Sequence, residues 1–239
     1  MWLHSLISGP FLGRRKRFFA DVALPDGPVV AHCANTGSMK SLLLPGSIAY
    51  LTHHSNPARK LAYTLELLRL SEGAWACVNT QRPNAQVAEA LQMGFIHGFP
   101  AGCRVEREVP CSAESRIDLR VILPSGPVWI EVKNVTLAES PCVASFPDAV
   151  SARGTKHLRE LAARVRAGER AAMFYLVNRD DVSHFHPAAE IDPLYAKELQ
   201  NAVQVGVEVL VYQTRFTISF DGTSVEMRVG SPLRWSLDS

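Results

Sequence analysis

Two acids and an amine near the middle of the chain have the types and spacing to bind a metal ion. Asp118 lies in one strand-like run, and Glu131 and Lys133 lie in the next, across the turn Pro-Ser-Gly-Pro at residues 124–127. A symmetric closure about that turn sets Asp118 opposite Lys133, Arg120 opposite Glu131, and the two acids diagonal to each other. Carboxylate oxygens suit Mg²⁺ or Mn²⁺, and an adjacent lysine can position water and stabilise charge on a phosphate. The pattern predicts a metal-dependent phosphodiester-cleaving site with Asp118 and Glu131 as metal ligands.

The alternation of residues along the two runs supports this hairpin, because residues two apart share one face of a strand. The predicted polar face holds Asp118, Arg120, Ile122, Trp129, Glu131 and Lys133, and the predicted apolar face holds Ile117, Leu119, Val121, Leu123, Val128, Ile130 and Val132. A slip by one residue would turn the carboxylates into the core, where unpaired charge is strongly unfavourable. A solvated strand face with a cross-strand Lys–Asp pair stays open as the alternative.

The segments around the hairpin indicate two domains with a boundary near residues 79–83. Before the boundary, turn signals separate strand-like segments at residues 18–24, 29–33, 47–52, 62–70 and 74–78, a pattern typical of a small OB-type barrel. After it, helices are expected at 84–93 (with Asn84 as the cap), 153–166 and 193–203, and strands at 115–123, 128–135, 171–177 and 207–212. We therefore expect an OB-like barrel over residues 1–80 and an α/β (α+β) domain over residues 81–239.

Composition narrows the function classes. The formal net charge is only +2, so a basic patch must be local. Five cysteines without a Cys-x-x-Cys pair argue against a disulfide framework or a zinc ribbon and favour a reducing cytoplasm. No apolar run reaches the roughly 18 residues of a membrane span, and the basic residues near the N-terminus follow the apolar stretch, unlike in a secretory signal. Serine hydrolase and dinucleotide-binding motifs are absent from the sequence.

Three further groups of residues have the chemistry to contact nucleic acid. A dense basic run precedes two phenylalanines, so it can contact phosphates while the rings stack on bases. The polar turn at residues 35–40 offers donors to a phosphate, and the helix at 153–166 gathers Arg153, Lys156, His157 and Glu160 near one side. The predicted nucleic-acid-binding set is Arg14, Arg15, Lys16, Arg17, Asn35, Thr36, Lys40 and Lys156. Each group has a structural alternative, as a solvated strand end, an ordinary turn or a wet helix face.

An ordered series of short segments, taken together, resembles a known family, the sugar fermentation stimulation protein A (SfsA) family. The segments are RFFADV at 17–22, NTGSM at 35–39, VNT at 78–80, SRID at 115–118, IEVKNVTL at 130–137, FPDAV at 146–150 and RGTKHLREL at 153–161. The Asp118…Glu131-x-Lys133 arrangement also resembles the core of PD-(D/E)xK nucleases, although Ile117 stands where the signature has proline.

The resemblance implies an N-terminal OB-like domain, a C-terminal nuclease-like domain, DNA binding, and a link to the regulation of sugar metabolism. Carried over by position, Asp118 and Glu131 are expected as metal ligands, Lys133 as the catalytic lysine and Glu89 as the acid of the preceding helix. We therefore expect a non-specific DNA-binding protein with a Mg²⁺- or Mn²⁺-dependent nuclease site. A non-catalytic DNA-binding regulator and an RNA-directed OB protein remain alternatives, and a homodimer is left open.

Overall fold

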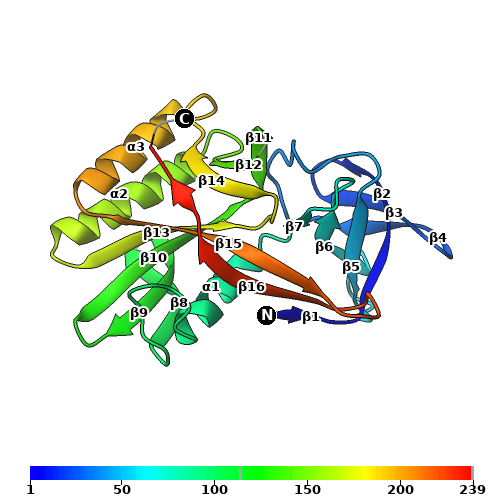
Figure 1. The fold of residues 1–239 in the computed structure, drawn as a ribbon, viewed down its shortest axis with the longest axis horizontal. Coiled ribbons are helices and arrows are strands. Elements are labelled where there is room, and N and C mark those ends of the chain that lie inside the picture. Colours follow the sequence, from blue (N-terminus) through cyan, green and yellow to red (C-terminus); the bar gives the residue numbers. More distant parts are fainter. Residues whose placement is uncertain (113–114, 141, 238–239) are drawn as a thin grey trace.

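A computed structural model describes residues 1–112, 115–140 and 142–237 and shows two domains side by side (Figure 1). The N-terminal domain contains β2 (Leu6–Arg15), β3 (Phe19–Leu24), β4 (Gly27–His32), β5 (Ile48–His53), β6 (Tyr63–Arg69) and β7 (Trp75–Cys77). Their order is β4-β3-β2-β5-β6-β7, and a parallel pairing between β4 and β6 closes five strands into a barrel. Its interior is filled by side chains such as Val22, Leu51 and Leu65, all fully buried. The predicted OB-like barrel is confirmed.

The long strand β2 is not predicted from the sequence, because its segment LISGPFLGRR holds two glycines and a proline, which are depleted in strands. The structure explains one of these residues. A Cβ atom on Gly9 would lie 2.0 Å from the carbonyl oxygen of Ala23 in β3, so only glycine allows the two strands to approach this closely. Gly9 therefore weakens the strand signal in the sequence and at the same time allows β2 to pair closely with β3.

The C-terminal domain is built on a seven-stranded sheet in the order β1-β16-β15-β13-β10-β9-β8. The strands are β1 (Trp2–Leu3), β8 (Arg104–Ser112), β9 (Ser115–Leu123), β10 (Gly126–Val135), β13 (Arg170–Val177), β15 (Glu208–Ile218) and β16 (Val225–Pro232). The central strands β10, β13 and β15 run parallel, whereas β8, β9 and β10 form an antiparallel meander. The edge strand β1 pairs with β16, so the first residues of the chain add a strand to the second domain.

Helices cover both faces of this sheet. One face packs against α1 (Pro83–Gln92), with Val87 and Leu91 in a cluster that also holds Ile130. The other face packs against α2 (Ala152–Arg166) and α3 (Pro193–Gln204), through residues such as Leu158 and Leu199. This arrangement confirms the predicted α/β character of the domain. None of the helices in the described ranges is both long and apolar enough to cross a membrane.

A small sheet and a buried ion pair lie where the domains meet. The sheet runs β11-β12-β14-β17, with β11 (Leu137–Ser140), β12 (Cys142–Phe146), β14 (Val182–Pro187) and β17 (Arg234–Trp235), and its β11 edge lies beside the barrel (Figure 1). Just before α1, the Arg82 guanidinium donates to both oxygens of Glu66, a fully buried barrel residue, at 2.8 and 2.6 Å. Breaking a buried ion pair strongly destabilises the folded state, because it leaves an unpaired buried charge. The pair therefore fixes the linker to the barrel.

Candidate active site

The hairpin of β9 and β10 closes through two residues, 124 and 125, rather than through a longer turn. Gly126 already belongs to β10 and has a φ of +114°, which favours glycine. Arg120 pairs with Trp129, two residues before Glu131, so the predicted pairing of Arg120 with Glu131 and of Asp118 with Lys133 is wrong. A shift of two residues keeps each side chain on its face because the pleat alternates with a period of two. The polar grouping therefore survives the wrong register.

Asp118 lies where the two strands separate. The ladder between them runs as far as the pair of Leu119 with Ile130. Beyond that pair, Asp118 Oδ2 accepts the backbone N–H of Val132 at 2.9 Å, so the carboxylate takes the place of a strand partner. Ile117 then packs in the cluster beneath α2, not with the apolar face of the hairpin as predicted. The divergence of the strands overrides simple alternation there.

Glu131 is the deepest acid of the site, with 2% of its surface exposed. Its Oε1 atom accepts from Lys133 Nζ at 2.6 Å and contacts Nδ1 of His157 on α2. The Lys133 amine also lies 3.1 Å from the same histidine nitrogen. The other oxygen, Oε2, is buried and has no hydrogen-bond partner within the part of the chain that is described. Because an unsatisfied buried oxygen is unfavourable, this atom is suited to a cation.

The two carboxyl groups have pKa values displaced in opposite directions. Burial first, and then the charge of Glu131, raises the pKa of Asp118, although the N–H of Val132 and the amide of Asn84 oppose the rise. Burial also raises the pKa of Glu131, but the hydrogen bond from His157 and the charge of Lys133 outweigh it, and this pKa is lowered. Neighbouring acids with separated pKa values are typical of functional sites. A bound cation would favour the ionised form of both.

The helix α1 contributes Asn84 rather than Glu89 to this site. Arg82 is the N-cap and Pro83 the first helical residue, so Asn84 does not cap the helix as predicted. Its amide instead donates to Asp118 Oδ1 at 2.8 Å. Glu89 forms an ion pair with the N-terminal ammonium at 2.6 Å. Residues five apart on a helix point about 140° away from each other, so in this structure the Glu89 side chain points away from Asn84 and toward the N-terminus.

The helix α2 brings His157, which the helical spacing in the sequence groups with Arg153, Lys156 and Glu160 but does not assign to the metal site. Ser151 caps the helix by accepting the N–H of Gly154, and His157 then faces Glu131 and Lys133. Arg153, one turn earlier, has its Nε atom 3.5 Å from His157 Nε2. Lys156 points elsewhere, is half exposed, and lies 3.9 Å from Glu160. The i, i+4 spacing of Arg153 and His157 was the available signal, but spacing alone does not say which residues meet β10.

In the predicted basic run at residues 14–17, two arginines bond to other parts of the barrel, and the other two residues are exposed to solvent. The Arg14 guanidinium donates to the carbonyl oxygens of Asn35 at 2.6 Å and Gly37 at 2.9 Å, and so holds the polar turn in place. Arg15 forms a two-pronged ion pair with Asp21. Lys16 and Arg17 are exposed, as are Thr36 and Lys40 of the predicted binding set.

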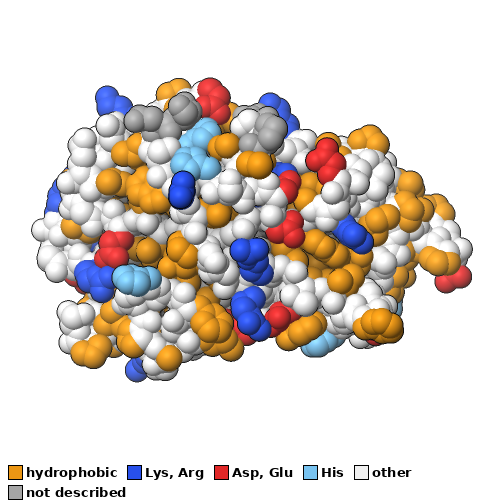
Figure 2. All heavy atoms as spheres, viewed as in Figure 1, with side chains coloured by type: hydrophobic (Ala, Val, Ile, Leu, Met, Phe, Trp, Pro, Cys, Tyr) orange, Lys and Arg blue, Asp and Glu red, His pale blue; other side chains and the backbone are white. Residues whose placement is uncertain are grey.

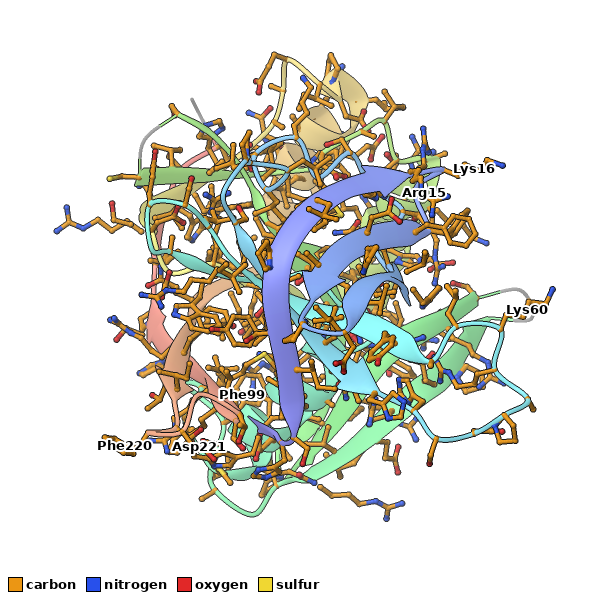
Figure 3. The ribbon with its side chains drawn as sticks, turned by 90° about the vertical axis from the view of Figure 1, so that its right-hand side faces the viewer. Arg15, Lys16, Lys60, Phe99, Phe220 and Asp221 are labelled. Carbon is orange, nitrogen blue, oxygen red and sulfur yellow. The ribbon has the colours of Figure 1, made fainter. Side chains whose placement is uncertain are left out.

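An apolar hollow of about 560 Å³ lies beside this run, lined by Phe18, Phe19, His32, Arg59, Lys60 and Leu61. Phe18 is 47% exposed. Figure 3 shows Arg15 and Lys16 at the end of β2 and Lys60 along the same edge of the molecule, with Phe220 and Asp221 at the opposite edge. On the face drawn in Figure 2, charged side chains of both signs are scattered rather than gathered into one broad basic patch. The positive edge of the barrel is therefore local, as the net charge requires.

Within the described residues, no three His, Cys, Asp or Glu side chains form a cluster that could by itself hold a metal ion. Asp118 and Glu131 are the two acids of the predicted site, and Glu108 lies near Asp118, since both accept from the Asn84 amide, at 3.3 and 2.8 Å. Two carboxylates are enough for Mg²⁺, which usually keeps several of its waters. The donor set therefore fits a partly hydrated divalent cation rather than a cation enclosed by protein ligands.

Comparisons with known families match both domains. Residues 12–78 match the SfsA N-terminal OB domain, and residues 81–220 match the sugar fermentation stimulation protein RE domain. A sugar fermentation stimulation protein homolog of Geobacter sulfurreducens is 47% identical over 213 residues, covering 89% of this chain and 90% of that protein. A homolog from Acidithiobacillus ferrooxidans is 42% identical over 237 residues, covering 98% and 99% of the two chains.

A solved structure is similar along almost the whole chain. It is described as the structure of Pyrococcus furiosus SfsA in complex with Ca²⁺. The TM-score is 0.86 at 26% sequence identity, and the match covers 99% of this chain and 98% of the other. The similarity therefore includes both domains and their arrangement.

Proposed function

This chain belongs to the sugar fermentation stimulation protein (SfsA) family, and we propose that it binds DNA and cleaves it at a divalent-metal site. The observation that carries the proposal is the pair of acids Asp118 and Glu131 beside the Lys133 amine. The Oε2 atom of Glu131 is buried and has no hydrogen-bond partner among the described residues. Mg²⁺ or Mn²⁺ bound there would activate water and stabilise charge on a phosphate. The Ca²⁺ in the Pyrococcus furiosus structure supports the presence of a divalent cation in this family.

The chain's own residues have distinct roles in this proposal. Asp118 and Glu131 hold the cation, and Asn84 orients the Asp118 carboxylate through the 2.8 Å hydrogen bond. Lys133, held by Glu131, stabilises negative charge that develops on the phosphate. His157 positions both groups from α2, since its Nδ1 atom contacts the Glu131 carboxylate and the Lys133 amine.

The barrel would supply the grip on nucleic acid. Exposed Lys16 and Arg17 can contact phosphates, and Phe18 can stack on a base at the rim of the apolar hollow. Arg59 and Lys60 line the same hollow and add positive charge to it. Aromatic rings beside cations are typical of surfaces that bind single strands without sequence preference.

The test is an incubation of the full chain with single-stranded and duplex DNA in Mg²⁺, in Mn²⁺ and in EDTA. We expect products with metal and none with EDTA, and we expect them to disappear in Asp118→Asn, Glu131→Gln and Lys133→Ala. Glu190→Gln removes an exposed acid elsewhere in the same domain and serves as the matched control. Calorimetric titration with Mn²⁺ adds a readout that does not depend on cleavage, and Asp118→Asn should weaken the binding of the ion.

A DNA-binding regulator without cleavage is the second candidate function. It is favoured by the saturation of Glu131 Oε1, which already contacts both Lys133 and His157. A carboxylate paired in this way gives a stable structure without any metal. DNA binding that stays intact while no product forms with either metal would establish this candidate and exclude the nuclease.

A further inference from the structure

A second hollow lies between the two domains, next to the candidate active site but separate from its carboxylates. Its volume is about 330 Å³, within the usual range for a small-molecule site. The barrel turn with Asn35 and Thr36 forms one wall, and the segment from Ser145 to Ser151 forms the other. Asn134, which also lines the hollow, directly follows Lys133 in β10. Ser151, the N-cap of α2, also lines the hollow, so β10 and α2, which carry Lys133 and His157, both form part of it.

The lining carries side chains that can form hydrogen bonds with a nucleobase. It combines the amides of Asn35 and Asn134, the hydroxyls of Thr36 and Thr80, and the carboxylate of Asp148. No lysine, arginine or histidine is among the described residues that line it. In a lining without these cations, a carboxylate repels phosphate but accepts N–H groups, as acidic side chains do from the amino group of cytosine. The lining therefore favours a neutral ligand rich in N–H groups over a phosphate.

One oxygen of Asp148 is available to such a ligand. Its Oδ2 atom accepts the backbone N–H of Ser38 at 2.6 Å and the Ser38 hydroxyl at 3.3 Å. Its Oδ1 atom carries no hydrogen bond within the described part of the chain. Phe146 and Pro147 add apolar surface to the same wall, against which a flat base can pack.

The hollow is formed before any ligand arrives. The bonds from Ser38 to Asp148 join residues 110 positions apart and lock the barrel turn against the second domain. Gly37 allows this contact, because a Cβ atom there would lie 2.2 Å from Asp148 Oδ2. The Arg14 guanidinium holds the carbonyls of the same turn. A preformed pocket loses little conformational entropy when it binds.

We propose that this hollow holds one unpaired nucleobase of a DNA strand whose adjacent phosphodiester lies over Asp118, Glu131 and Lys133. The inference rests on the proposed function and specifies its substrate class as single-stranded DNA or a frayed strand end. The base enters the hollow through its amino edge, toward Asp148 and Asn35. The backbone then passes Lys133, and the remaining strand extends along the barrel toward Lys16 and Phe18.

Free nucleosides test the pocket without requiring cleavage. The full chain, labelled with ¹⁵N, is titrated with 2′-deoxycytidine, thymidine and deoxyribose 5-phosphate up to about 10 mM, since stacking of a single base is worth only roughly 1–3 kcal/mol. We expect deoxycytidine to shift the amide signals of Asn35, Thr36 and Asn134, thymidine to do so less, and the sugar phosphate to leave them unchanged. Equal shifts with the sugar phosphate, or none with deoxycytidine, would overturn the inference.

Two variants connect the pocket to strand binding. Thr36 is exposed at the mouth, so Thr36→Trp blocks the hollow without disturbing the core; Ser71→Trp, in the exposed turn between β6 and β7, is the matched control. Thr36→Trp should weaken binding of a deoxycytidine 12-mer at least tenfold by fluorescence anisotropy in EDTA, and Ser71→Trp less than twofold. Asp148→Asn should reduce the preference for deoxycytidine over thymidine. Ser38→Ala removes the hydroxyl that donates to Asp148 and keeps the Asp148 carboxylate, so it should retain the preference.

The outcomes separate this inference from the nuclease proposal. If the protein cleaves DNA but deoxycytidine causes no amide shifts and Thr36→Trp does not weaken strand binding, only the base pocket is overturned. Nucleoside shifts in a protein that never cleaves DNA support the pocket and overturn the nuclease. A protein that binds neither nucleosides nor single strands, and cleaves neither single-stranded nor duplex DNA, overturns both.

Discussion

The acidic face of β10 and the basic edge of the barrel are both short runs of charge in the sequence, yet the fold treats them differently. Glu131 and Lys133 are two residues apart and meet at one point, with 2.6 Å between carboxylate and amine. Arg14 and Arg15 are adjacent and have separate internal roles, one holding a turn and the other paired with Asp21. A strand face concentrates its charges, whereas a strand end distributes them.

This difference determines how a charge motif should be interpreted. On β10 the alternating pattern places like-facing residues together, and burial makes their interactions strong. At the end of β2 the chain enters a turn in which Lys16 and Arg17 have positive φ values, 49° and 63°. Four basic residues follow one another there, but fewer than four are available to a ligand, because Arg14 and Arg15 bond within the barrel.

The largest expected difference between the acidic face of β10 and the basic edge of the barrel is in the rate of DNA cleavage. Lys133→Ala should lower the rate of DNA cleavage by about 10² to 10³, the usual result of removing one group that stabilises a transition state. Arg17→Ala should leave the rate at saturating DNA unchanged and raise only the concentration needed. Single-turnover rates at several protein concentrations measure both. An equal loss of maximal rate in the two variants would place the barrel edge at the chemistry.

The next effect is on folding stability. Arg14→Ala leaves the carbonyls of Asn35, Gly37 and Ser38 without their charged donor. The change should lower the free energy of unfolding by roughly 1.5–3 kcal/mol, as for hydrogen bonds to charged groups. Urea denaturation followed by circular dichroism provides the measurement, with the exposed Lys16→Ala as the control. If both variants unfold at the same urea concentration, Arg14 does not hold the turn.

The raised pKa of Asp118 predicts a pH-dependent change in stability without metal. A group whose pKa is higher in the folded state contributes stability below its unfolded pKa and loses it as pH rises through the folded pKa. Burial, followed by the charge of Glu131, causes this shift. Asp118→Asn in EDTA should therefore raise the Tm at neutral pH, where each 1 kcal/mol corresponds to roughly 2–4 °C. The gain should vanish under acidic conditions, and a Tm gain of the same size at all pH values would contradict this cause.

The smallest effect concerns the salt dependence of DNA binding. Lys16→Ala and Arg17→Ala together should flatten the plot of log affinity against log salt by roughly 0.7 for each lost phosphate contact with a single strand. Arg15→Ala should flatten it less, because that guanidinium is already paired with Asp21. Anisotropy titrations at several salt concentrations test both expectations. A larger effect from Arg15→Ala would mean that the ion pair opens when DNA binds.

Much of the second domain could be predicted from local pattern. The strand at residues 115–123 and the helix near 153–166 were located almost to the residue, since alternation and helical spacing are properties of short segments. The register of the hairpin was not, because it depends on whether the turn takes two residues or four. The strand β2 was missed because its glycines and proline weaken the strand signal, and Gly9 serves a close contact with β3.

By itself the sequence determined which side chains share a face: Asp118, Glu131 and Lys133 lie together because the pleat repeats every two residues whatever the register. Only the tertiary structure decided what meets that face. Asn84 and His157 arrive from two helices, and Asp148 meets the barrel turn across 110 residues. Such contacts depend on how layers and domains pack, and no spacing within a short segment encodes that geometry.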